Sequence, residues 1–149
     1  MASPPISLKG RALRLLSGRE YSRLELERRL EKYEEEPGAL AKALDELQAK
    51  DFISEQRVLE SVVHRRAAKL GAARIKQELQ AKGLDADAIT QAMQALRATD
   101  VDRAREVWAK KFGQPPADAA ERCKQIRFLA SRGFGGEAIH KVVSGDSEE

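Results

Sequence analysis

A run of cations in the middle of the chain is the part of the sequence best suited to a chemical task. Between residues 57 and 82 seven lysines and arginines stand against two glutamates, so the local charge is +7 − 2 = +5. The whole chain of 149 residues carries only +3. Clustered cations repel one another, and binding of a polyanion or an acidic protein surface offsets that cost. The run therefore predicts an acidic partner, although an ordinary solvated helix face gives the same pattern.

The candidate binding residues form two sets. The main set brackets a glycine bend at residue 71 and comprises Arg57, Arg65, Lys69, Arg74 and Lys76, with Arg66 in the same run. We expect these cations to converge at one corner of the molecule. The second set comprises Lys82, Lys124, Arg127 and Arg132. No aromatic residue is interleaved with the main set, so base stacking of the kind that single-strand binders use is not indicated.

Enzymatic chemistry has little support in the sequence. The chain holds two histidines, His64 and His140, and one cysteine, Cys123. It contains no His-Glu-x-x-His spacing, no cysteine pair, no Gly-x-Ser-x-Gly turn and no phosphate-cradling glycine loop. We therefore predict no catalytic, metal or cofactor site. Cys123 is expected to be a small buried residue and His64 an exposed helix position.

The elements that must position these cations are helices. The chain is 42% hydrophobic and 34% charged, with only 5% aromatic residues. Alanine, leucine and the charged residues with long side chains favour helix over strand, and no segment alternates as a half-buried strand does. Glu78 stands four residues from both Arg74 and Lys82, which is the spacing of ion pairs on a helix surface.

A helical pattern nearly repeats itself about every fifty residues. Apolar residues occupy matching positions in the copies: Leu26, Leu30, Leu40, Leu44 and Leu47, then Ile75, Leu79, Ile89, Met93 and Leu96, then Leu129, Ile139 and Val143. The Lys-Gly-Leu of residues 82–84 matches the Arg-Gly-Phe of residues 132–134. The period predicts an all-α fold of three tandem three-helix repeats that form an elongated, curved body.

The expected organisation is a flexible leader at 1–7, repeats at 8–53, 54–99 and 100–143, and an acidic tail at 144–149. Local signals mark the helix ends. Ser22 and Glu25 have the spacing of a capping box. We expect Gly18 to end the helix before it in a left-handed conformation, and Asp100 to cap a later helix.

The sequence also bears on the compartment. It has no apolar run near eighteen residues and no signal-peptide pattern at its N-terminus. A single cysteine cannot form an internal disulfide, which fits a reducing environment. We expect a cytoplasmic protein with no membrane contact.

Several segments together resemble the bacterial regulatory protein RecX. They read Lys-Gly-Arg-Ala-Leu-Arg-Leu-Leu-Ser at 9–17, Arg-Glu-Tyr-Ser-Arg at 19–23, Glu-Leu at 25–26, Leu-Gln-Ala-Lys-Gly-Leu at 79–84, Lys-Lys-Phe at 110–112 and Arg-Phe-Leu-Ala-Ser-Arg-Gly-Phe at 127–134. Each is a short helical signature, and their order and spacing carry the resemblance, which runs from about Leu8 to Val143. RecX-like chains often have a Gly-aromatic-Gly turn after an arginine-rich stretch, whereas here Gly71-Ala72 has neither the aromatic nor the second glycine.

The resemblance implies a modulator of the recombinase RecA. It implies binding to RecA, to RecA filaments on single-stranded DNA and to DNA, and restraint of recombinase activity, ATP hydrolysis and strand exchange in recombination and DNA repair. We expect no cofactor, and we expect a monomer. Two other readings stay open at this point: a DNA-binding regulator that acts on nucleic acid without RecA, and a scaffold that joins proteins. An enzyme is the least favoured reading.

Overall fold

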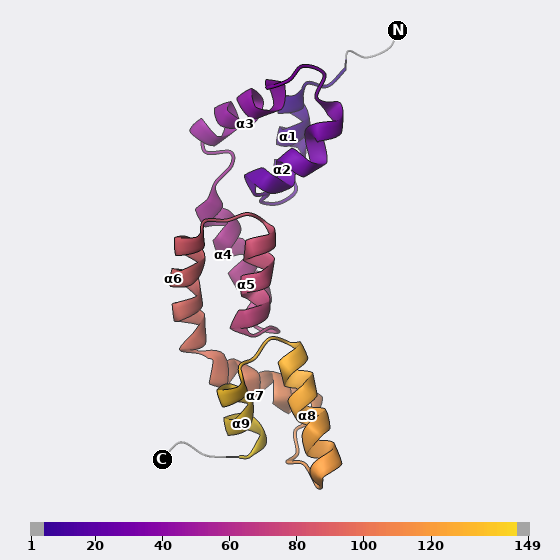
Figure 1. Cartoon of the computed structure of the whole chain (residues 1–149), viewed down its shortest axis with the longest axis vertical. Helices are drawn as coiled ribbons and strands as arrows, with labels where there is room; N and C mark the ends of the chain where they lie inside the picture. Colours follow the sequence, from indigo (N-terminus) through magenta and orange to yellow (C-terminus); the bar gives the residue numbers. More distant parts are fainter. Residues whose placement is uncertain (1–4, 146–149) are drawn as a thin grey trace. The chain divides into compact units, whose positions relative to one another are not determined.

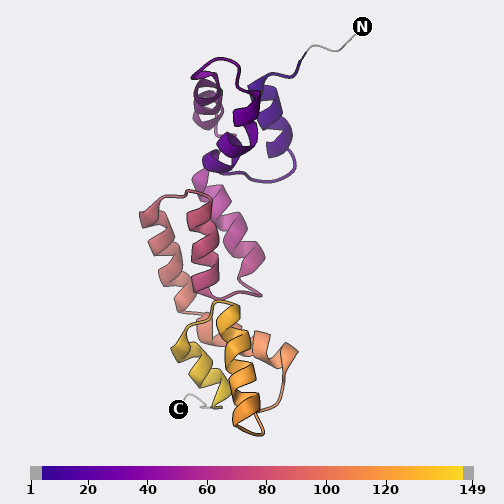
Figure 2. The same cartoon turned by 45° about the vertical axis from the view of Figure 1, so that its right-hand side comes forward.

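The computed structural model describes residues 5–145, which form nine α-helices and one short 3₁₀-helix and contain no strand (Figures 1 and 2). The helices are α1 (Leu8–Leu16), α2 (Arg23–Leu30), η1 (Glu31–Tyr33), α3 (Ala39–Ala49), α4 (Glu55–Arg66), α5 (Ala72–Ala81), α6 (Ala86–Arg97), α7 (Asp100–Lys111), α8 (Ala119–Ser131) and α9 (Gly136–Val143). The all-α prediction is confirmed. Most of the expected leader and tail, at 1–4 and 146–149, lies outside the described residues.

Contacts within the chain divide it into two compact units. The first comprises the described residues up to Ser61 together with Lys82–Leu84. The second comprises Val62–Ala81 together with the described residues from Asp85 onward. Helices α1, α2 and α3 therefore belong to the first unit, and α5 to α9 belong to the second. The repeat boundaries expected from the sequence stay a prediction.

The first unit packs α1, α2 and α3 around one apolar core. Its buried members are Ala12, Tyr21, Leu26, Leu30, Leu40, Leu44, Leu47 and Ile53. The apolar positions that the sequence period marks in its first copy are all among them. Burial of such side chains removes apolar surface from water, which stabilises the folded state by about 25 cal/mol for each Å² buried.

The second unit buries the later copies of the same pattern. The positions Ile75, Leu79, Ile89, Met93 and Leu96 are each at most 6% exposed. A cluster between α7, α8 and α9 contains Ala104, Leu129, Phe134, Ile139, Val142 and Val143. The periodic positions are thus confirmed as the inward faces of the helices.

Of the two predicted helix ends at the connection between α1 and α2, one is confirmed and the other is wrong. The capping box is confirmed, because the Glu25 N–H donates to Ser22 Oγ at 3.2 Å and the Ser22 N–H donates to Glu25 Oε1 at 3.0 Å. The expected left-handed Gly18 is wrong. Ser17 keeps a right-handed helical conformation, and the Gly18 N–H donates to the Leu15 carbonyl at 3.0 Å, so a tight 3₁₀-type turn ends α1 instead.

The expected role of Asp100 is also wrong. Asp100 is the first residue of α7, after Thr99, and does not cap that helix. Its carboxylate accepts a hydrogen bond from the backbone N–H of Ala72, the first residue of α5. Asp100 therefore satisfies the start of a helix far away in the sequence, which local spacing cannot reveal.

Cys123 is exposed on α8, so its expected burial is wrong. The buried positions of α8 are Gln125 and Leu129, which are one turn apart. Cys123 precedes Gln125 by two residues and therefore points to roughly the opposite side of the helix. His64 is exposed, as expected.

Candidate anion-binding pocket

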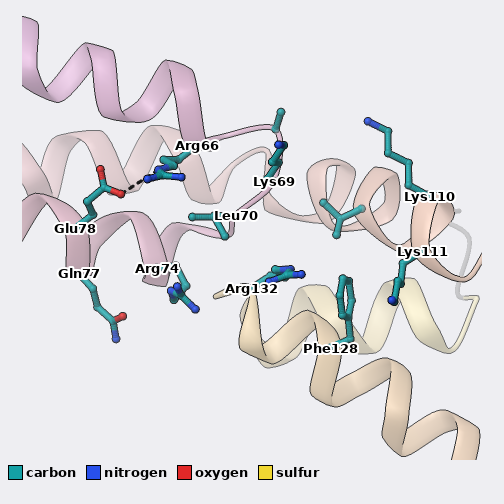
Figure 3. Close-up of a pocket in the computed structure, with 12 residues that line it drawn as sticks. Arg66, Lys69, Leu70, Arg74, Gln77, Glu78, Lys110, Lys111, Phe128 and Arg132 are labelled. Atoms are coloured by element: carbon teal, nitrogen blue, oxygen red, sulfur yellow. Dashed lines mark hydrogen bonds and ion pairs between the residues drawn. The ribbon is translucent and has the colours of Figure 1, made fainter. Parts of the chain in front are cut away.

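An open pocket of about 760 Å³ lies within the second unit (Figure 3). The end of α4, the loop that follows it, α5, α7 and α8 all contribute to its lining. The lining holds one carboxylate, that of Glu78, and six cations, so its formal charge is +6 − 1 = +5. The cations are Arg66, Lys69, Arg74, Lys110, Lys111 and Arg132.

An aromatic side chain supports two of these cations. The guanidinium of Arg132 lies 4.7 Å from the ring centroid of Phe128, and the ammonium of Lys111 lies 5.5 Å from it. Phe112 packs edge-on against the same ring, with the centroids 5.5 Å apart. Figure 3 shows Phe128 beside Arg132 and Lys111. Cation–π contacts of this kind hold the charges in place without neutralising them.

A backbone contact fixes the inner edge of the pocket. The Gly71 N–H donates to the Arg132 carbonyl at 2.8 Å, and the Ala73 N–H donates to the Gly133 carbonyl at 3.2 Å. A Cβ on Gly71 would overlap the Gly133 carbonyl, and a Cβ on Gly133 would overlap Arg74. Gly133 also has a φ of +91°, which favours glycine. The start of α5 is thereby held against the turn between α8 and α9.

A second support is Arg103 on α7. Its guanidinium donates to the carbonyls of Ala67 at 2.9 Å and Leu96 at 3.3 Å, as well as to that of Leu70. It also forms an ion pair with Asp100, and each side chain is 12% exposed. Burial raises the pKa of the Asp100 carboxyl despite the neighbouring positive charge, and burial lowers the pKa of Arg103. Arg103 thus joins the ends of α4 and α6 behind the pocket.

Four of the ten cations selected from the sequence line the pocket: Arg66, Lys69, Arg74 and Arg132. Arg66 forms an ion pair with Glu78 at 3.0 Å, and Arg74 donates to the Ser131 carbonyl at 2.7 Å. The expected helix pairs of Glu78 are replaced, because its carboxylate turns across to α4 and away from its neighbours on α5. Of the main set, the pocket brings together Lys69 and Arg74.

The other six selected cations lie outside the lining: Arg57, Arg65, Lys76, Lys82, Lys124 and Arg127. Arg57 is in the first unit and forms ion pairs with Glu20 at 2.9 Å and Asp51 at 3.0 Å. Lys82 pairs with Glu25 at 3.1 Å, also in the first unit. Arg65 lies 3.9 Å from Glu78 Oε2, so internal carboxylates pair with three of these six candidates.

The sequence reasoning missed two cations and the aromatic ring of the pocket. Lys110 and Lys111 end α7, and Phe128 lies on α8. A pair of adjacent lysines at a helix C-terminus is a common pattern, because it suits the negative end of the helix dipole. Their approach to the basic run before α5 depends on tertiary packing, for which the sequence carries no local signal.

Metal-ion clusters and membrane-spanning helices are both absent from the described part of the chain. Residues 5–145 contain no group of three or more His, Cys, Asp or Glu side chains arranged to hold a metal ion. Over the same range, every helix is too short or too polar to cross a membrane.

Comparison with known proteins places the chain in a family. The second three-helix domain of RecX matches residues 54–93, and the third matches residues 98–143. The regulatory protein RecX of Leptothrix cholodnii is 53% identical over 140 residues, which cover 94% of this chain and 89% of that protein. The chain belongs to the RecX family. The RecX protein of Herminiimonas arsenicoxydans is 47% identical over 148 residues, covering 99% of this chain and 98% of that protein.

Solved RecX structures share the fold. RecX from Lactobacillus salivarius superposes with a TM-score of 0.75 at 21% identity, over 93% of each chain. A second crystal structure of a regulatory protein RecX gives 0.75 at 18% identity, over 93% of this chain and 72% of that one. The tandem three-helix repeats and the resemblance inferred from the sequence are thus confirmed, and the relatives support a regulatory role of the RecX type.

Proposed function

We propose that this chain regulates the recombinase RecA by binding RecA filaments on single-stranded DNA, and that it limits their activity without chemistry of its own. The charge of the pocket is the observation that carries the proposal. Six cations surround one carboxylate, and that carboxylate is already paired with Arg66. A positive site of this kind suits a polyanionic partner, and a nucleoprotein filament presents phosphates at regular intervals.

The RecX relatives favour RecA as the protein component of that partner. The alternative, a regulator that acts on nucleic acid alone, uses the same pocket and predicts tight DNA binding without RecA. Such binding weakens steeply with salt, because each phosphate contact releases counterions. A scaffold that joins proteins predicts a partner whose binding is indifferent to DNA.

One titration separates these three functions. The chain is added to RecA on single-stranded DNA, to RecA alone and to DNA alone, each at two salt concentrations. We expect the strongest binding to the filament, with inhibition of the DNA-dependent ATPase of RecA. Equal affinity for DNA with and without RecA would favour the nucleic-acid regulator, and equal affinity for RecA with and without DNA would favour the scaffold.

A charge-removal variant tests the pocket itself. The triple change Lys69→Gln, Lys110→Gln and Lys111→Gln removes three pocket cations, one from the loop after α4 and two from the end of α7. We expect about tenfold more protein to be needed for the same ATPase inhibition, the result of losing three partly exposed contacts of up to ~1 kcal/mol each.

The matched control removes three exposed cations that do not line the pocket. It carries Arg14→Gln, Arg28→Gln and Lys42→Gln, all in the first unit. This variant has the same net charge as the pocket variant, so a general electrostatic effect would weaken ATPase inhibition by both variants equally. Equal inhibition by the two variants would remove the pocket from the proposed mechanism.

A further inference from the structure

The same turn contact occurs once in each unit. In the first unit Gly83 packs on Leu24 of α2, and in the second Gly133 packs on Arg74 of α5. Both glycines have positive φ angles, 73° and 91°. The two glycines are fifty residues apart and each packs on the first turn of a helix, so the charged residues around the two contacts can be compared.

The charges at the two contacts differ. Lys82, beside Gly83, forms an ion pair with Glu25 at 3.1 Å, and the two side chains are only 14% and 19% exposed. In the second unit, Arg132 lies 50 residues after Lys82 and Arg74 lies 49 residues after Glu25, so these two arginines occupy the corresponding positions. An ion pair with no net charge in one contact is thus replaced by two arginines in the other.

Arg74 occupies a position that electrostatics disfavours for a cation. It is the third residue of α5, as Glu25 is the third residue of α2. The first turn of a helix is the positive end of its dipole and favours carboxylates. Arg74 also lies against the backbone next to Arg132, since a Cβ on Gly133 would overlap its side chain. Two cationic residues therefore lie near one another at a helix N-terminus.

Within residues 5–145, no carboxylate forms an ion pair with Arg74 or Arg132. The one carboxylate of the pocket lining, Glu78, pairs with Arg66 at 3.0 Å. Arg74 donates to the Ser131 carbonyl, which uses one of the five N–H donors of its guanidinium. Figure 3 shows the Arg74 and Arg132 guanidinium groups on the same side of the pocket.

We propose that a phosphate group binds between Arg74 and Arg132, in the place that the Glu25 carboxylate holds in the first contact. Guanidinium groups recognise phosphate oxygens in pairs, and the dipole of α5 adds to the attraction. The bound group bridges α5 and the turn after α8, so it stabilises the second unit. Lys69 and Lys111 line the same pocket and can meet neighbouring phosphates.

The phosphate group has two possible sources: a nucleic-acid backbone or free phosphate. The inference deepens the proposed function and rests on it only where the DNA of the filament is taken as the source. The binding site itself rests on the arginine pair, and phosphate binding is measurable without RecA or DNA.

Thermal unfolding of the full chain in phosphate and in chloride, at equal ionic strength, tests the site. We expect the Tm to rise by roughly 3–6 °C at a tenfold excess of phosphate over its dissociation constant. Arg74→Glu recreates the charge pattern of the first contact and should raise the Tm in chloride, since the carboxylate pairs with Arg132 and suits the helix start. The same variant should lose the phosphate-specific rise.

Phosphate also stabilises proteins generally, because it is excluded from their surfaces. The control Arg14→Gln with Arg28→Gln should therefore show the full rise of the natural chain. Arg132→Gln is a second pocket variant that removes one guanidinium without adding a carboxylate, and it should also lose the specific rise. Equal rises in the natural chain, Arg74→Glu and Arg132→Gln would overturn the proposal.

An oligothymidylate labelled for anisotropy distinguishes the sources. If phosphate displaces the bound oligonucleotide, and if Arg74→Glu weakens oligonucleotide binding about tenfold, the site is assigned to a nucleic-acid backbone. A phosphate-specific rise without competition by the oligonucleotide supports the site and assigns it to free phosphate. If Arg74→Glu loses phosphate binding yet still inhibits RecA fully, the site stands and the proposed use of this pocket on the filament fails.

Discussion

Gly71 and Gly133 lie backbone against backbone, and neither position has room for a side chain. The Gly71 N–H donates to the carbonyl of the residue before Gly133 at 2.8 Å. This contact brings the start of α5, which carries Arg74, against the turn after α8, which carries Arg132. A pair of small residues therefore decides where two large charged ones lie.

Gly71→Ala should destabilise the second unit by about 1–3 kcal/mol, because the new Cβ meets backbone atoms of Gly133 that cannot rotate away. Urea unfolding followed by circular dichroism measures the change. Gly136→Ala is the matched control, since its Cβ meets open space at the start of α9. It should be neutral or stabilising by up to ~1 kcal/mol. Equal midpoints for the two variants would contradict the close contact.

Arg103→Met should cost about 2–4 kcal/mol of unfolding free energy. The change leaves Asp100 buried without its partner and removes the donor to the Ala67 and Leu96 carbonyls. Arg105→Met removes an exposed arginine of the same helix, which lies 3.5 Å from Asp102, and should change stability by less than ~0.5 kcal/mol. Similar losses in the two variants would show that Arg103 does not hold the helix ends together.

The helices and their buried faces could be predicted from the sequence because both follow from local periodicity. Leu26 and Ile75 mark matching inward positions, and both are fully buried. Ser22 and Glu25 lie three residues apart, so their capping box needs no knowledge of the rest of the chain. Asp100 was misread because the helix start that it satisfies, at Ala72, lies in another part of the sequence.

The candidate site could be predicted only in part, for the same physical reason. The basic run marked Lys69 and Arg74, which are close in sequence. Lys111 reaches the same pocket from α7, and the sequence gives no signal of that approach. Arg57 belongs to the same run, yet Glu20, 37 residues away, pairs with it. Charge patterning locates cations, whereas tertiary contacts decide which of them stay unneutralised.

Glu25 should make the first unit sensitive to acid. Burial by itself raises the pKa of this carboxyl, but the Ser22 N–H, Arg19 and Lys82 outweigh it and lower the pKa to about 2. Its pKa in the folded state is thus below the ordinary value of 4.5, so its stabilising contribution is complete above about pH 4.5 and is lost as the pH falls toward 2.

The free energy of unfolding in urea, measured from pH 7 to pH 2, tests this assignment. Glu25→Gln should lower stability at pH 7 by on the order of 1–2 kcal/mol, a value discounted because solvent screens a partly exposed carboxylate, and should flatten the acid limb of the curve. Glu27→Gln, which removes the i,i+4 partner of Arg23, is the control and should leave the acid limb unchanged. Parallel curves for the natural chain and Glu25→Gln would contradict the assignment.

Gln125 is a buried polar residue whose two ends are both bonded, so its replacement by an apolar residue should be costly. It is fully buried on α8, accepts from Trp108 Nε1 at 2.8 Å and donates to the Gln114 carbonyl at 3.0 Å. Gln125→Leu leaves both partners without a bond in a half-buried setting, which should cost about 1–3 kcal/mol. Trp108 is the only tryptophan of the chain, so its fluorescence reports urea unfolding at this contact.

The matched control is Gln80→Leu, at an exposed position of α5, which should change the midpoint of urea unfolding little. A midpoint for Gln125→Leu equal to that of the natural chain would mean that water replaces the lost bonds and that the glutamine does not hold α7 to α8.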